Sequence, residues 1–198
     1  MKILFFVDTH GSEQYHREIV KKSKNVDLVV CAGDFTIFES NMHVLLRMFD
    51  SIGKPFILIH SNHETSSGLM AACQSLKNVK FIYNSYYVKD KVIFFCYGGG
   101  GFSITDKSFD VIAENLMRTK QKDFPNHKLI FVTHQPPHNT NLDNIGEHVG
   151  NINFRKFIER HQPLYAISGH IHETFDIDDK IGKTILFNPG PIGRIIEI

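Results

Sequence analysis

The sequence has few cysteines and none of the cysteine patterns that mark disulfide frameworks or zinc sites. It contains Cys31, Cys73 and Cys96 among 198 residues, and no pair has C-x-x-C spacing. Cys31 and Cys96 lie inside apolar, strand-like runs. We interpret the cysteines as small, mostly buried hydrophobic residues in a reducing compartment, which excludes a disulfide-stabilised secreted domain.

Long apolar runs and a strong net charge are also missing. No stretch approaches the roughly 20 apolar residues that are needed to span a bilayer. The apolar run near the start, residues 3–7, is too short for a signal sequence and ends at Asp8. The formal net charge is +1, so the basic field of a general nucleic-acid binder is absent. We therefore predict a soluble, cytoplasmic protein in which any phosphate chemistry needs a local positive charge, such as bound metal.

Buried strands and amphipathic helices alternate in the first part of the chain. This alternation predicts parallel strands that are joined by right-handed helical crossovers. We expect Ser12 to cap the first helix. The predicted strands are residues 3–7, 28–32 and 56–59, and the predicted helices are residues 13–24, 42–51 and 67–75.

The middle of the chain has a different pattern, because three strand-like segments follow one another without room for helices. These are residues 79–83, 86–89 and 92–97. Further on, the pattern predicts helices at 109–122 and 154–161 and strands at 128–132, 164–167, 174–177, 184–187 and 194–198. No repeat, linker or low-complexity segment interrupts the chain. We expect one α/β domain over residues 1–198, with a mixed sheet or a pair of sheets.

Residue types that commonly bind metals follow five of the predicted strands. In open α/β sheets, ligands bind at the carboxyl ends of the strands, so we expect these side chains to lie together. Each motif alone can occur by chance, but five at successive strand ends are hard to explain by coincidence. The motifs are Asp8-Thr9-His10, Gly33-Asp34, Ser61-Asn62-His63-Glu64, His134, and Gly169-His170-Ile171-His172.

The chemistry of these side chains predicts a site for two divalent ions. Imidazole, carboxylate and one amide oxygen, without thiolate, suit manganese, iron, zinc, cobalt or nickel, and we predict manganese first. The ligands are too many for one tetrahedral ion, and with Asp34 bridging they suit two ions about 3.5–4 Å apart. Side chains at i and i+2 on an extended segment point the same way. We therefore expect Asp8 with His10, and His170 with His172, each to point at one centre.

The five motifs resemble those of the calcineurin-like metallophosphoesterase superfamily, and within it the small Icc-related phosphoesterases. The resemblance runs from Asp8 to His172 and includes the form His134-Gln135-Pro136-Pro137. It implies a four-layer α/β/β/α sandwich with two mixed β-sheets. It also implies a hydrolase of phosphodiesters or phosphomonoesters, in which a bridging water activated by the metals attacks phosphorus in line.

The resemblance also implies a role for each motif residue. His63 takes the place of the histidine that contacts the scissile phosphate and helps the leaving group to depart. By position, the ligands of the first metal are Asp8, His10, Asp34 and His172, and those of the second are Asp34, Asn62, His134 and His170.

Ser61 departs from the family pattern, which usually has glycine before the Asn-His pair. If the backbone needs a positive φ there, the serine carries strain. We also expect His60 to support a strand end. The segment Gly98–Gly101 lacks the pattern of a phosphate-binding loop, and we expect it to form a rim near the site.

Two other functions remain open at this point. Some relatives of this fold are non-catalytic interaction scaffolds that have lost the histidine corresponding to His63, so its presence here favours catalysis, and the metal content of the purified protein separates the two. A nuclease is the second alternative, and the near-neutral charge argues against it. We expect a small phosphate-ester substrate, no membrane partner and no nucleic-acid partner. The sequence selects no oligomeric state, and a homodimer is compatible with it.

Overall fold

The alternating strands and helices of the first half build one β-sheet. The computed structural model describes residues 1–198, and its first sheet has the strand order β11-β1-β2-β3-β4. Strands β1 to β3 run parallel, as predicted, and β4 also pairs parallel with β3, whereas β11 pairs antiparallel with β1 and makes the sheet mixed. The strands are β1 (Lys2–Phe6), β2 (Leu28–Cys31), β3 (Phe56–Leu58), β4 (Val79–Phe81) and β11 (Arg194–Glu197).

The second half of the chain builds the other sheet, with the strand order β5-β6-β7-β8-β10-β9. Its four central strands run parallel, and the edge strands β5 and β9 are antiparallel to their neighbours. The strands are β5 (Ser85–Lys89), β6 (Val92–Tyr97), β7 (Lys128–Thr133), β8 (Tyr165–Ile167), β9 (Asp178–Ile181) and β10 (Thr184–Phe187).

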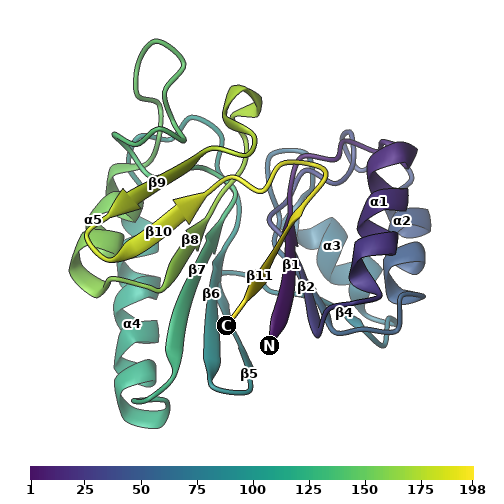
Figure 1. Cartoon of the computed structure of the whole chain (residues 1–198), viewed down its shortest axis with the longest axis horizontal. Helices are drawn as coiled ribbons and strands as arrows, with labels where there is room; N and C mark the ends of the chain where they lie inside the picture. Colours follow the sequence, from purple (N-terminus) through teal and green to yellow (C-terminus); the bar gives the residue numbers. More distant parts are fainter.

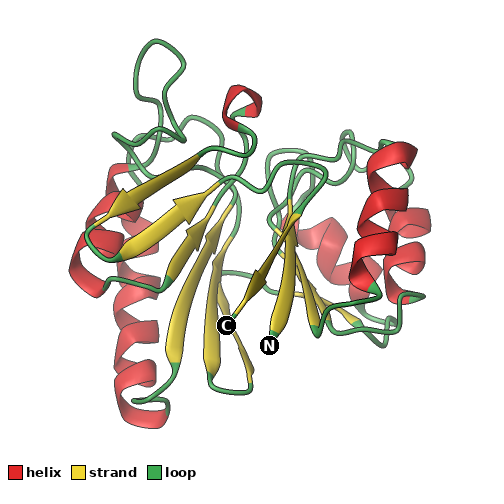
Figure 2. Cartoon of the chain, viewed as in Figure 1, coloured by secondary structure: helices red, strands yellow, loops and turns green.

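Helices cover the outer face of each sheet, which gives the predicted α/β/β/α sandwich (Figures 1 and 2). On the first sheet lie α1 (Glu13–Ser23), α2 (Met42–Asp50) and α3 (Ser66–Cys73), and on the second lie α4 (Lys107–Asp123) and α5 (Ile152–His161). None of these helices combines the length and the apolar character that a membrane crossing requires.

Apolar side chains on both faces of each sheet hold the four layers together. Successive side chains of a strand point to opposite faces. Phe5 of β1 accordingly packs between the two sheets, whereas Leu4 and Phe6 pack against the helices of the first sheet. A third cluster joins the second sheet to α4 and α5. Burial on both faces explains why the strands appear in the sequence as nearly continuous apolar runs.

Three local predictions need correction or refinement. The predicted strand at residues 174–177 is wrong, because a short 3-10 helix, η1 (His172–Thr174), occupies its start and β9 begins only at Asp178. The Thr174 hydroxyl donates to the Ile171 carbonyl at 2.8 Å, and such local side-chain bonds favour a turn over a strand. Ser12 occupies the N-cap position of α1, but its side chain makes no capping hydrogen bond. The chain also changes sheets between β4 and β5, which strand spacing alone did not show.

Candidate metal centre

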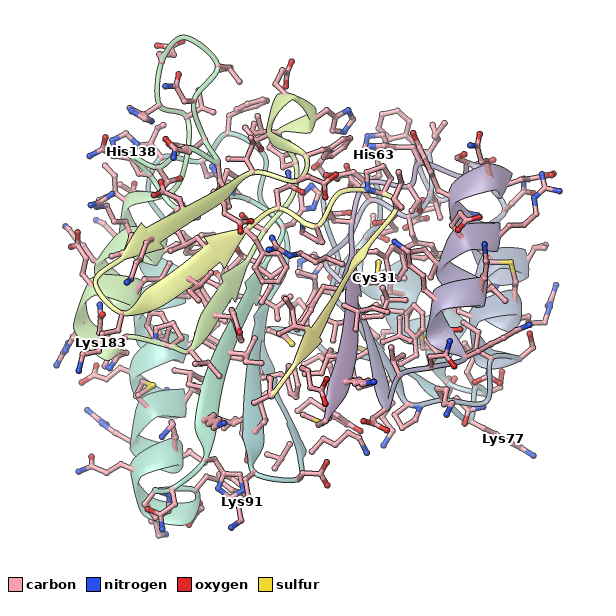
Figure 3. All side chains as sticks on the ribbon, in the orientation of Figure 1. Cys31, His63, Lys77, Lys91, His138 and Lys183 are labelled. Carbon is pink, nitrogen blue, oxygen red and sulfur yellow. The ribbon has the colours of Figure 1, made fainter.

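The carboxyl ends of β1, β2, β3, β7 and β8 bring the predicted ligands together. His63, labelled in Figure 3, lies at this edge of the two sheets. In three overlapping clusters, the potential ligand atoms lie within 4.8 Å of one another. The clusters are Asp8 with His10 and His172, His10 with Asp34 and His63, and Asp34 with His134 and His170. Asn62 joins the third cluster, since its Oδ1 lies 2.9 Å from His134 Nε2.

Asp34 lies at the centre of these clusters and is almost fully buried. Its Oδ2 atom lies 3.5 Å from His134 Nε2, 3.7 Å from His10 Nε2 and 3.9 Å from His63 Nε2. One carboxylate thus faces histidines of two clusters. This is the arrangement expected of a ligand that bridges two ions.

The loops that carry four of these residues have left-handed backbones. The φ angles are 54° at Asp8, 42° at His10, 52° at Asp34 and 71° at His170. The segments are therefore not extended, and the prediction that residues at i and i+2 point at one centre is wrong for the second pair. His170 belongs to the cluster of Asp34, whereas His172 belongs to that of Asp8. Such backbone strain persists only where surrounding contacts impose it, and it concentrates at functional sites.

Contacts between the loops impose this geometry. The His10 amide donates to the Asp34 carbonyl at 3.0 Å, and the His170 amide donates to Asp8 Oδ2 at 2.9 Å. Gly169 makes the second contact feasible, because a Cβ atom there would lie 2.2 Å from Val7 Cγ2. The glycine of the Gly-His-x-His motif is thus required by close approach of the β8 and β1 loops.

Ser61 is part of a buried hydrogen-bond network and not a point of strain. Its φ lies outside the left-handed region, so the strain expected for a serine there is absent. Its Oγ accepts from the Asp34 amide at 2.9 Å and donates to Glu64. Glu64 is buried and also accepts from the Asp34 amide at 3.0 Å and from Thr36 N and Oγ1 at 2.8 and 2.7 Å. The network fixes the backbone of Asp34.

Burial and mutual charge shift the pKa values of the clustered groups. Burial raises the pKa of Asp8 to about 7 and lowers that of His170 to about 4. Burial also acts to lower the pKa of His134, but its hydrogen bond to Asp34 and the Asp34 charge outweigh this and raise it to about 9. The Asp34 pKa is lowered, because contacts with His134 outweigh the opposing effect of burial. Without metal, Asp34 and His134 therefore form a buried ion pair.

Two orphaned ligand atoms show that the site suits divalent cations. Asp8 Oδ1 and His170 Nε2 are buried and have no hydrogen-bond partner. Buried polar atoms in folded proteins nearly always have partners, and these two belong to different clusters: His170 to one that contains Asp34, and Asp8 to one that is linked to Asp34 through His10. Bound cations would satisfy both atoms, and the donor set of imidazole nitrogen and carboxylate oxygen matches their chemistry.

His63 is held by Phe38, a residue that no sequence motif indicates. The Phe38 amide donates to His63 Nδ1 at 3.3 Å. The Phe38 side chain, 75% exposed, stacks on the His63 ring at a centroid distance of 4.4 Å. His63 also donates its own amide to Asp34 Oδ1 at 3.2 Å. These contacts fix the ring with Nε2 toward the centre.

The glycine segment Gly98–Gly101 and His60 lie in the surroundings of the centre. The exposed Phe102, directly after the glycine segment, packs against His170 at a centroid distance of 4.8 Å, so this segment does lie at the rim of the site. The His60 ring packs against Phe81 and Tyr83 near the end of β3, and its Nδ1 has no hydrogen-bond partner.

The two-sheet sandwich, with candidate metal-ligand clusters of histidine and aspartate at its strand ends, is the architecture of a metallophosphoesterase. The chain belongs to the calcineurin-like phosphoesterase family, whose family model matches residues 1–174. An uncharacterised protein of Methanocaldococcus jannaschii is 29% identical to it, over 96% of this chain and 88% of that protein.

Solved structures with the same fold are more distant in sequence. A dimetal phosphatase from Danio rerio superposes with a TM-score of 0.69 at 10% identity, over 97% of this chain and 88% of that one. A phosphopantetheinyl hydrolase from Mycobacterium tuberculosis gives a TM-score of 0.61 at 11% identity, over 96% and 88% of the two chains. At these identities the likeness establishes the fold.

Proposed function

We propose that this protein hydrolyses phosphate esters, either diesters or monoesters, at a centre of two divalent ions. One observation carries the proposal. The carboxylate of Asp34 is shared between two clusters, one of which holds the unpartnered His170 Nε2, while His10 links the other to the cluster that holds the unpartnered Asp8 Oδ1. Membership of the calcineurin-like phosphoesterase family supports phosphate esters as the substrate class.

The proposed ligands form two sets that share Asp34, as the family resemblance implies. Manganese is the first choice, and iron, zinc, cobalt and nickel suit the same donors. When bound, the ions would neutralise phosphate charge and supply an activated water for in-line attack at phosphorus. The ligands proposed for the first ion are Asp8, His10, Asp34 and His172, and those for the second are Asp34, Asn62, His134 and His170.

His63 is proposed to act on the substrate directly. Because Nδ1 accepts the Phe38 amide hydrogen, the proton of the neutral ring belongs on Nε2. Nε2 faces the centre, 3.9 Å from Asp34 Oδ2. From there it can donate a hydrogen bond to a phosphate oxygen or to the departing alcohol, which stabilises developing negative charge.

A metal analysis combined with an activity screen tests this proposal. Manganese-loaded protein should contain close to two ions per chain and should hydrolyse bis-p-nitrophenyl phosphate or p-nitrophenyl phosphate in a chelator-sensitive manner. Asp34→Asn should lose both metal and activity, because it weakens both sites. Absence of turnover on every monoester and diester would remove the enzyme proposal. Absence of bound metal would favour the scaffold, and activity confined to oligonucleotides would favour a nuclease.

A further inference from the structure

A groove begins at the metal centre and runs between α1 and α2, which lie side by side in Figure 1. It encloses about 730 Å³, and His10 belongs both to its lining and to the metal centre. Binding sites for small organic molecules typically have volumes of about 300–1,000 Å³. The groove is therefore large enough for the organic group of an ester whose phosphate lies at the centre.

The apolar part of the groove lining is exposed. Ile37 is 50% exposed and Val44 is 56% exposed, and both line the groove together with Leu45 and Met48. Water-exposed apolar side chains that gather in a concave surface next to a reactive centre are typical of ligand sites. Ile37 and Val44, with the half-buried Leu45 and Met48 beside them in the lining, offer a bound molecule an apolar contact.

The loop that carries Ile37 is rigidly held. Phe38, Glu39 and Asn41 have φ angles of 46°, 63° and 56°. The Glu39 amide donates to the His63 carbonyl at 3.2 Å, and Glu39 Oε1 accepts from the Thr65 amide at 2.8 Å. Bulky residues take up left-handed conformations only where such contacts impose them. The exposure of Ile37 is consequently a fixed feature of the groove wall.

The formal charges in the groove compensate each other. Glu13 and Arg17 line it and form an ion pair one helical turn apart, with 3.5 Å between Oε2 and Nη2. The remaining lining residues other than histidines carry no formal charge. A second phosphate or a polyanionic chain therefore finds no unpaired cation in the groove, whereas an uncharged group meets the apolar wall.

We propose that this groove binds the organic group of the substrate and that this group is apolar, an alkyl chain or an aromatic ring. The inference rests on the proposed function, since it places the phosphate at the metal centre. Ile37 and Val44 then determine specificity by contacting the apolar group. His10 lines the groove and also belongs to the metal centre, so the groove adjoins the place proposed for the reacting phosphate.

A series of diesters that share one leaving group tests the proposal. Methyl, butyl, hexyl and phenyl p-nitrophenyl phosphates all release p-nitrophenolate, so the chemical step stays constant while the apolar group changes. For each methylene that becomes buried, kcat/KM should rise about fourfold. Ile37→Asp and Val44→Asp should flatten this dependence. The matched control is Val111→Asp, which places the same charge at another exposed valine, on α4.

A binding measurement separates failure of the groove from failure of the catalytic proposal. Calorimetry with manganese-loaded protein compares hexylphosphonate with methylphosphonate, neither of which can be hydrolysed. Tighter binding of hexylphosphonate that Ile37→Asp abolishes supports the groove even if no ester is turned over. Equal binding of the two phosphonates, or a chain-length preference that survives in both groove variants, overturns the inference. A gain for the phenyl ester alone identifies an aromatic group as the preferred one, and a gain for hexyl alone identifies an alkyl chain.

Discussion

Replacement of Ser61 by alanine tests whether the buried network positions the bridging carboxylate. The change removes one of four hydrogen bonds to Glu64 and one of two acceptors of the Asp34 amide. A hydrogen bond to a charged group contributes about 1.5–3 kcal/mol to stability. We expect Ser61→Ala to lower the free energy of unfolding by that amount. Ser61→Gly should cost about 0.5–1 kcal/mol more through backbone entropy, although glycine is the usual residue of the family.

Ser61→Ala should also weaken metal binding, because hydrogen bonds to the Asp34 amide stabilise the left-handed backbone of Asp34. Loss of groups that orient a metal ligand typically reduces affinity about 10- to 100-fold. Urea denaturation of the metal-free protein measures the stability, and competition with a chromophoric chelator measures the affinity. Ser67→Ala is the matched control, since Ser67 is exposed on α3 and should change stability by less than about 0.5 kcal/mol.

The reasoning is refuted if Ser61→Ala matches the control in both measurements. A second outcome would refute only the positioning part. If stability falls while metal affinity stays at the wild-type value, the network supports the fold and does not orient Asp34. Recovery of affinity in Ser61→Thr, which keeps the hydroxyl, would attribute the effect to the hydrogen bonds.

Four further predictions follow from the same centre. His63→Ala should lower kcat by about 10²- to 10⁴-fold while the protein still binds two ions, and a drop to one ion would make His63 a ligand instead. Because the pKa of His134 is raised from 6.5 to about 9, metal binding at pH 8 should release about one proton, measured by calorimetry in buffers of different ionisation enthalpy. In the metal-free protein, that raised pKa stabilises the fold below pH 6.5, and this contribution should be lost as the pH rises through about 9. Gly169→Ala should reduce stability by about 1–3 kcal/mol, detected as a lower Tm, because its Cβ would lie 2.2 Å from Val7 Cγ2.

The proposed groove would extend recognition from the phosphate group to the organic group of the substrate. The proposed two-ion centre would bind the phosphate group without selecting the alcohol. Ile37 and Val44 lie outside the motifs and line the adjacent groove. We therefore expect discrimination between esters to depend on Ile37 and Val44 and not on the proposed metal ligands.

The sequence by itself predicted the layered α/β fold and the residues that gather at the centre. Burial patterns repeat with the period of strands and helices, and parallel strands necessarily bring their carboxyl ends to one edge of a sheet. Asp8, Asp34, Asn62, His134 and His170 could thus be expected near one another from local patterns. Their roles as ligands remain predictions for metal analysis.

The tertiary structure decided what depends on contacts between distant segments. Strand spacing does not show which strands pair, so the change of sheets between β4 and β5 was hidden. Left-handed backbones at Asp8 and His170 are imposed by neighbouring loops, and they assign His170 and His172 to different clusters. One of the two acceptors for the Asp34 amide comes from Ser61, 27 positions away. Such features follow from packing between strand ends, which local hydrophobic patterns do not encode.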